Sequence, residues 1–283
     1  MKNINFVYYN TDYRKVLDSL IDPILPYLNN YTKNSEADEN SLNVNFFRED
    51  PKKVNVFCSH GIACKNWRNA WDVKDYDYIF VSGELWKEKL IQQGLDKNKI
   101  FINGYTKLDP IFQGKYKKST YDKKVILFAP THIAIPSISL KNRFEENFKY
   151  FDKYKIIDSS HPTAKSDQSP TLQALVDADI VISDSGSLLY EAWLLGKQVV
   201  FVDWLIKEEV HNHIPYSFED FIYEKEVGLH AKNIKEMCEL VDFASENELD
   251  KNVVDFMESI FPTSLRGKSG EMTAQILKEL AKL

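Results

Sequence analysis

Short apolar runs alternate with helix-like segments along most of the chain, and this alternation limits the fold more than any other feature. Eight runs are rich in branched and aromatic residues and have the length of strands buried on both faces. They are INFVYY, VNVFCS, YIFVSG, KIFING, KVILFAP, KIIDSS, DIVISD and QVVFVD. Helical patterns fall between several of them, at residues 84–94, 141–151 and 170–178. Such alternation is typical of parallel sheets with crossover helices, so we expect an α/β protein.

A polar, basic stretch separates the strand-like runs into two groups. This stretch, GKYKKSTYDKK at residues 114–124, is the predicted linker between two domains. We expect an N-terminal, acceptor-side Rossmann-like domain at 1–116 and a nucleotide-donor-binding Rossmann-like domain at 122–270, facing each other across a cleft. A C-terminal helix at 271–283 is expected to pack back on the first domain. The last third of the chain has helical patterns at 233–245, 249–260 and 270–283, and residues 29–41 are predicted to form a loop.

Composition narrows the classes of partner. The 283 residues include 36 basic and 42 acidic ones, and the net charge of −6 does not favour nucleic acid or anionic lipid. The N-terminus lacks a signal-peptide pattern and no apolar run approaches the ~20 residues of a membrane span. We therefore expect a cytoplasmic protein, with at most peripheral association at the inner membrane face. Cys58, Cys64 and Cys238 include no closely spaced pair, which argues against a disulfide framework and a structural zinc site.

The stretch ISDSGSLLYEAWLLGKQVV predicts a strand, a turn, a helix and a second strand. The turn of Ser185, Gly186 and Ser187 opens the helix, where unpaired N–H groups and partial positive charge suit a phosphate. Gly186 allows close approach, and the serines add hydroxyl donors. Serines that only cap the helix are the alternative. Glu191, about one turn later, could accept hydrogen bonds from a ribose diol, or it could form a surface ion pair.

Two histidines follow strand-like runs in different halves of the chain. His60 begins HGIACK, with Gly61 and Lys65, and His161 lies in SSHPTAK, where Pro162 fixes the backbone. In parallel sheets, ligands collect at the carboxyl ends of strands, so these rings could face each other across the cleft. One imidazole could then take a proton from a hydroxyl while the other binds a phosphate. The sequence leaves open which ring is the base, and a histidine bound to a backbone carbonyl is the alternative for each.

Two further patterns bear on metal binding. His211 and His213 alternate as in a metal-binding strand pair, but no third ligand is identifiable, so we predict no zinc site. Asp177 and Asp179 resemble the Asp-x-Asp of metal-dependent transferases, yet they precede a strand and are interpreted as a solvated turn. We predict no metal and no cofactor. The basic linker could meet an anionic acceptor or lipid surface, although a solvated linker is the favoured interpretation.

These motifs resemble two related groups of proteins. The spacing of DSG, EA and LGK is similar to the nucleotide-binding half of GT-B glycosyltransferases and of UDP-N-acetylglucosamine 2-epimerases. HGIACK resembles the His-Gly-x-x-x-Lys motif of the CDP-glycerol glycerophosphotransferase family, the teichoic-acid primases and polymerases of GT-B architecture. Further motifs follow in that family's order, over roughly residues 54–203. They are YDYIFVSGELWKEKL, GYTKLD, VILFAPTH, the HP at His161 and SDSGSLLYEAWLLGK.

The resemblance implies transfer of a glycerol phosphate, or a similar polyol phosphate, from a CDP-activated donor to an acceptor hydroxyl, with release of CMP. His60 would be the general base and His161 would bind or neutralise the donor phosphates. The donor would be bound by Asp184, Ser185, Gly186, Ser187 and Glu191, with Thr131 and His132 near its phosphates. Gly61, Lys65 and Lys107 would lie on the acceptor or phosphate side. Positioning and charge neutralisation suffice for displacement at phosphorus, so no metal is required.

The chain also departs from that family. Ser59 replaces the usual aromatic residue before the first histidine, and Ser185 and Gly186 stand where Tyr-Ser is common after the aspartate. Lys107 replaces a common arginine, whose fork binds phosphate in two places. A GT-B glycosyltransferase that uses a UDP-, CMP- or GDP-linked sugar therefore stays as an alternative. A 2-epimerase-like enzyme or a non-catalytic nucleotide-binding protein is the second. The acceptor, whether wall polymer, capsule, glycolipid or modified nucleobase, and the oligomeric state stay open.

Overall fold

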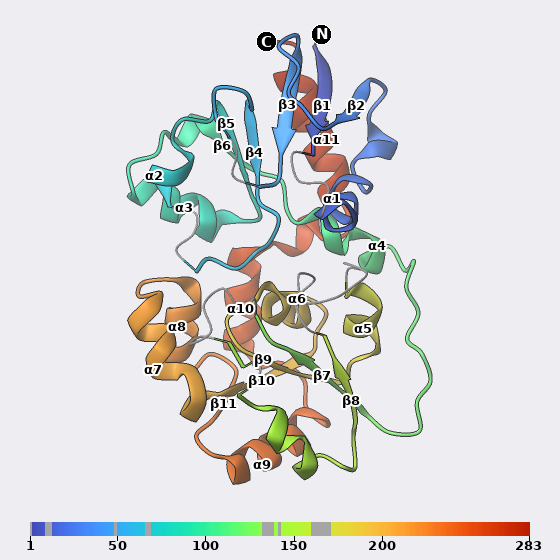
Figure 1. The fold of residues 1–283 in the computed structure, drawn as a ribbon, viewed down its shortest axis with the longest axis vertical. Coiled ribbons are helices and arrows are strands. Elements are labelled where there is room, and N and C mark those ends of the chain that lie inside the picture. The colour runs from blue at the N-terminus through green and yellow to red at the C-terminus, as the bar shows by residue number, and fades with distance from the viewer. Residues whose placement is uncertain are drawn as a thin grey trace.

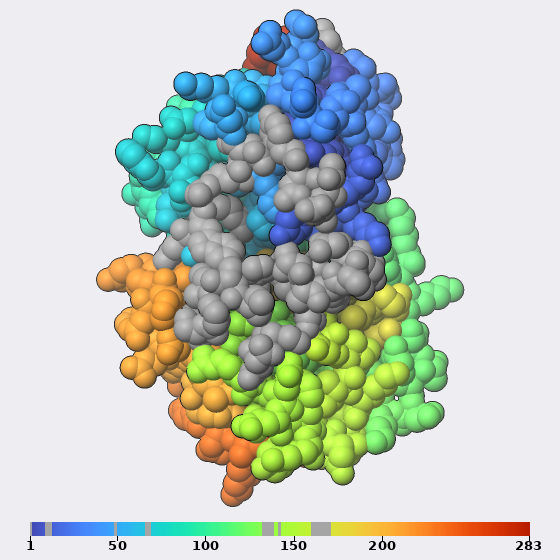
Figure 2. Space-filling view, in the orientation of Figure 1, coloured from blue at the N-terminus to red at the C-terminus, as the bar shows by residue number. Residues whose placement is uncertain are grey.

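The chain folds around two parallel β-sheets, which confirms the predicted α/β class (Figure 1). The computed structural model describes residues 2–8, 13–47, 50–65, 69–131, 139–140, 143–159 and 171–283. The N-terminal unit forms the upper, blue-to-teal lobe in Figure 2, and the C-terminal unit forms the lower, green-to-orange lobe. No helix in these ranges is long and apolar enough to cross a membrane.

The N-terminal unit contains a six-stranded parallel sheet in the order β2-β1-β3-β4-β5-β6. Its strands are β1 (Asn3–Val7), β2 (Tyr31–Asn34), β3 (Ser41–Asn45), β4 (Val56–Cys58), β5 (Tyr78–Val81) and β6 (Ile100–Ile102). Its helices are α1 (Arg14–Ile21), α2 (Ala70–Val73), α3 (Glu84–Gln92) and α4 (Asp109–Phe112). Most strand residues other than those of β2 are buried, as expected for strands covered on both faces.

The C-terminal unit contains a five-stranded parallel sheet in the order β11-β10-β9-β7-β8. Its strands are β7 (Val125–Ala129), β8 (Lys155–Asp158), β9 (Ile180–Ser183), β10 (Gln198–Val202) and β11 (Leu229–Ala231). Its helices are α5 (Leu172–Asp177), α6 (Ser187–Leu194), α7 (Asp203–His213), α8 (Phe218–Glu224), α9 (Ile234–Ala244) and α10 (Lys251–Ile260). The chain runs outward in opposite directions from β7 and β9, so these neighbouring strands form the switch point where ligands bind in doubly wound sheets.

The last helix returns to the N-terminal unit. After α10, which contacts both α3 and α6, the chain enters α11 (Ser269–Leu280) in the upper lobe (Figure 1). The Asn103 amide donates a hydrogen bond to the Thr273 hydroxyl at 2.9 Å, and the Lys2 N–H donates to the Ala281 carbonyl at 2.8 Å. The chain therefore joins the two units twice, once through residues 113–124 and once between α10 and α11.

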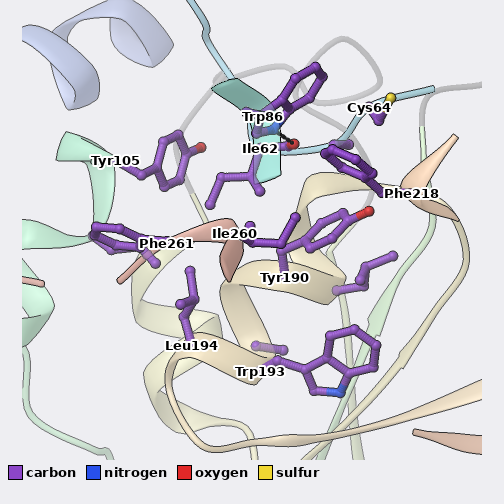
Figure 3. Packing of buried hydrophobic residues seen from close by; sticks show 14 of the residues in the cluster. Ile62, Cys64, Trp86, Tyr105, Tyr190, Trp193, Leu194, Phe218, Ile260 and Phe261 are labelled. Carbon is purple, nitrogen blue, oxygen red and sulfur yellow. Dashed lines mark hydrogen bonds between the residues drawn. The ribbon is translucent and has the colours of Figure 1, made fainter. Parts of the chain in front are cut away.

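The hydrophobic core continues from one unit into the other. Ile62, Trp86 and Tyr105 of the N-terminal unit are buried in the same cluster as Tyr190, Phe218 and Ile260. Figure 3 shows these side chains packed together, with the Trp86 indole N–H donating to the Ile62 carbonyl at 3.1 Å. Because apolar surface is buried across the boundary, separating the units would expose it to water.

Several sequence-based expectations on secondary structure were wrong. Residues 29–41, predicted as a loop, contain β2, an exposed edge strand paired with β1. Strands β3 and β11 and helices α1, α7 and α8 were not predicted. The segment predicted as a helix at 141–151 contains a 3₁₀ helix, Glu145–Tyr150, within its described part. The sequence of β3 is SLNVN. Because its buried Asn43 and Asn45 are polar, the strand lacks the continuous apolar pattern by which other strands were predicted.

Candidate functional site

Asp184 connects the ends of β7 and β9 at the switch point. Its fully buried carboxylate accepts hydrogen bonds from the N–H groups of Thr131 and Leu140, at 2.9 Å each. It also accepts from Ser185 at 2.6 Å and Gly186 at 3.1 Å. Burial raises the pKa of Asp184, although these N–H groups and the Lys65 charge oppose the rise. Asp184 therefore lies beneath the serine turn and shapes it.

The serine turn presents fewer donors than its sequence suggests. Ser185 and Gly186 are buried and their N–H groups donate to Asp184, whereas Ser187 is half-buried at the first position of α6. The N–H groups of Ser187 and Leu188 lie in the first helical turn, where no intrahelical acceptor exists. These two groups, together with the helix dipole, are the anion-binding donors that the turn offers.

The loop of the HGIACK motif lies directly on this turn. The Ala63 N–H donates to the Ser187 hydroxyl at 3.3 Å, and a Cβ at Gly61 would lie 2.6 Å from the same oxygen. The buried Lys65 reaches across the boundary, and its ammonium donates to the Thr131 hydroxyl. The structure therefore brings together four predicted site residues, Gly61, Lys65, Thr131 and Ser187, from both units.

His60 lies at the exposed end of the same loop. Its ring stacks on Phe47 with 4.4 Å between ring centroids, and its Nδ1 lies 3.3 Å from the Phe46 carbonyl oxygen. A carbonyl oxygen only accepts, so this contact favours a proton on Nδ1 and places the lone pair of the neutral ring on Nε2. That tautomer is the one a general base at Nε2 needs. His161 and His132 lie outside the described residues.

Glu191 is buried at the boundary between the units, not exposed on a helix surface. The Lys107 ammonium lies 2.8 Å from each carboxylate oxygen, and the Tyr105 hydroxyl donates to Oε1 at 2.9 Å. Glu191 is fully buried, and the Lys107 side chain is 14% exposed. The predicted ribose-binding residue and the predicted phosphate-side lysine are therefore each other's partner in this structure.

Glu219, which contacts the motif loop, and Tyr190, which contacts Glu219, were missed in the sequence. Glu219, in α8, is fully buried and accepts hydrogen bonds from the Cys64 N–H at 2.8 Å and the Lys65 N–H at 2.7 Å. The Tyr190 hydroxyl donates to the same carboxylate at 2.5 Å. In the sequence, Glu219 is one acidic residue among several in YSFEDFIYEK, so no local pattern marks it.

The two patterns considered for metal binding have other roles. His211 and His213 lie on α7 and not on strands, and His211 pairs with Asp220 at 3.1 Å. Asp177 is buried and accepts from the Ser119 N–H at 2.8 Å, and Asp179 forms an ion pair with Lys118. These aspartates bind Ser119 and Lys118 of the linker and so hold it against the C-terminal unit. Their interpretation as a solvated turn was wrong. No group of three or more metal-ligating side chains occurs among the described residues.

Comparisons with known proteins agree with the predicted architecture. No protein-family model matches the chain. A teichoic acid glycerol-phosphate primase of Bacillus subtilis (strain 168) is 23% identical, over 65% of this chain and 58% of the primase. The chain thus spans less than two thirds of the length of that relative.

Solved structures extend the likeness to nearly the whole chain. A structure of the wall teichoic acid polymerase TagF matches with a TM-score of 0.66 at 14% identity, over 99% of this chain and 89% of that one. An S. aureus MnaA–UDP structure matches with a TM-score of 0.55 at 12% identity, over 100% of this chain and 98% of that one. The predicted GT-B-like fold and the resemblance to teichoic-acid primases and polymerases are therefore confirmed.

Proposed function

We propose that the chain transfers a glycerol phosphate, or a similar polyol phosphate, from a CDP-activated donor to an acceptor hydroxyl in cell-surface polymer synthesis. One observation carries this proposal: the HGIACK loop of one unit lies on the anion-binding start of α6 in the other. The base candidate His60 and the anion-binding N–H groups at Ser187 therefore come from opposite sides of the boundary, and Gly61, next to His60, lies against the Ser187 hydroxyl. The match to the primase and the likeness to TagF support the choice of reaction.

The proposed reaction is an in-line displacement at the phosphorus next to glycerol. The acceptor oxygen bonds to this phosphorus, its proton moves to His60 Nε2, and the bond to the bridging oxygen breaks to release CMP. The first N–H groups of α6 and the Lys65 ammonium would neutralise the charge that develops on the leaving group. Independence of metal ions and the roles of His161 and His132 in binding the donor phosphates remain parts of this proposal.

A nucleotide-sugar reaction is the second candidate. The Asp-Ser-Gly turn and the full-length likeness to the MnaA–UDP structure favour it. A thermal-shift series with CDP-glycerol, CDP-ribitol, CMP-sugars and UDP-sugars separates the two, because the preferred ligand raises the melting temperature most. We expect CDP-glycerol to be preferred; stabilisation by a UDP-sugar alone would replace the first proposal with the second.

The decisive activity test is the His60→Ala variant. Removal of a general base lowers turnover by about 10²–10⁴-fold, and CMP release from CDP-glycerol, with and without EDTA, is the measurement. His213→Ala is the matched control, because His213 lies on the surface of α7. Turnover by His60→Ala at the wild-type rate would exclude His60 as the base.

A further inference from the structure

The HGIACK loop is held in its shape from outside its own unit. Lys65 has a φ of 43°, in the left-handed region that disfavours residues with a side chain. The adjacent N–H groups of Cys64 and Lys65 point together at one acceptor, an arrangement of successive amides that binds anions. The anion here is the Glu219 carboxylate from the C-terminal unit.

We infer that Glu219 is a positioning residue that fixes this loop so that the Lys65 ammonium reaches Thr131, beside the anion-binding turn. Its two oxygens are divided between the loop amides, Oε1 to Cys64 and Oε2 to Lys65. With the backbone held in this way, the Lys65 side chain turns toward Thr131, at the end of β7. This inference rests on the proposed function, because in that reaction the Lys65 ammonium acts on the donor phosphates.

The surroundings of Glu219 explain why its carboxylate stays in place. Tyr190, from α6, donates to Oε1, so the same carboxylate joins α6, α8 and the loop. Figure 3 shows the Tyr190 hydroxyl on the side of Phe218 and Cys64, within the packed boundary between the units. The loop is also held from its own unit by the bond between Trp86 and the Ile62 carbonyl. Glu219 therefore lets the C-terminal unit set the backbone of the N-terminal motif.

Glu219→Gln is the central test, because glutamine keeps the size of the side chain but replaces one acceptor oxygen with a donor. Tyr190→Phe is the matched control: it removes the third hydrogen bond and leaves both bonds to the loop. Hydrogen–deuterium exchange of a peptide covering residues 60–65 is the first readout. We expect faster exchange in Glu219→Gln and little change in Tyr190→Phe. Unchanged exchange in Glu219→Gln overturns the inference, whatever the protein catalyses.

A double-mutant cycle with Lys65→Ala separates positioning from general structural damage. Displacement of reacting groups by about 1 Å can cost on the order of 100-fold in turnover, so we expect a loss of that size for Glu219→Gln in kcat/KM for CDP-glycerol. In the Lys65→Ala background the same change should cost less than about 3-fold. Equal losses in both backgrounds overturn the inference. Absence of wild-type turnover contradicts the proposed function and leaves the exchange result to decide the role of Glu219.

Discussion

The two units meet in two regions that are built differently. In the crossing contact, the segment from the end of α10 to the start of α11 crosses into the upper lobe. Backbone lies against backbone at Gly83 and Ile260 and at Gly270 and Pro23, and the Asp109 carboxylate accepts hydrogen bonds from the Ser269 and Gly270 N–H groups. A Cβ at Gly83 would overlap the Ile260 carbonyl, and a Cβ at Gly270 would overlap the Pro23 carbonyl. The second region is the α6 contact, where hydrogen bonds and an ion pair that involve side chains join the units. The HGIACK loop, Tyr105 and Lys107 lie on one side of it, and Thr131, Ser187, Glu191 and Glu219 lie on the other.

The two contacts therefore differ in how easily their atoms can move. Backbone atoms cannot move aside without displacing a whole helix, so the crossing contact fixes how the units are arranged. Side chains can change rotamer within nanoseconds when they are released, so the α6 contact can exchange partners without refolding. Of the predicted site residues, those of the HGIACK loop together with Lys107, Thr131, Ser187 and Glu191 lie in the α6 contact.

The largest expected loss of stability is in the α6 contact. Lys107→Met leaves the fully buried Glu191 carboxylate without its cation, and breaking a buried pair costs about 3–5 kcal/mol. Urea denaturation measures the free energy of unfolding. The double variant Lys107→Met/Glu191→Met should regain most of the loss, because an apolar pair carries no desolvated charge. A loss below about 1 kcal/mol in the single variant would show that this pair behaves like an exposed one.

The crossing contact is tested by Gly270→Ala. The new methyl group meets the Pro23 backbone, and overpacking of this kind costs about 3 kcal/mol. Gly186→Ala, at the residue that precedes α6, is the matched control: its Cβ would lie 3.5 Å from Thr131, an ordinary distance, and its φ is −82°. The control should lose less than about 1 kcal/mol in the same denaturation experiment. Similar losses in both variants would contradict the distinction between backbone and side-chain contacts.

The smallest expected effect is a dependence of stability on pH, to which Asp109 in the crossing contact and Asp184 beneath the start of α6 contribute. Burial raises the pKa of Asp109, opposed by the N–H groups of Gly270 and Ser269, and burial likewise raises the pKa of Asp184. The folded chain then holds these protons to higher pH than the unfolded chain, whose aspartates titrate near 3.8. Folding takes up protons in this window, so stability falls as pH rises from about 4 through the raised pKa values.

Asp109→Asn removes one of these two groups. The decline in unfolding free energy between pH 4 and neutrality should be shallower in this variant than in the wild type, as measured by urea titration at each pH. A decline of equal slope would mean that Asp109 ionises in the folded chain as it does in the unfolded one.

The sequence was most informative where the strands are apolar throughout. Runs such as VILFA and IVIS predicted β7 and β9, and the small residues after them correctly indicated the turn that begins α6. It was least informative where polar residues are buried by partners distant in the chain. Asn43 in β3 bonds to Asn5 at 2.9 Å, and this pairing exists only once the sheet has formed.

The same limit applies to the site. The spacing of Glu191 placed it on α6 near the turn, but Lys107 and Tyr105 lie 84 and 86 residues away in the chain. Glu219 is separated from the amides that it binds by 154 and 155 residues. Contacts of this kind depend on how the two units are arranged, and local periodicity carries no information on that arrangement.

The ion pair between Lys107 and Glu191 has a consequence for how a nucleotide would enter. A ribose that bonds to Glu191 would compete with the Lys107 ammonium for the same carboxylate oxygens, and this ammonium joins the two lobes. Occupancy by such a ligand would loosen the lobes at this point. Conversely, a stronger ion pair at this point would weaken the binding of such a nucleotide, because the two equilibria are linked.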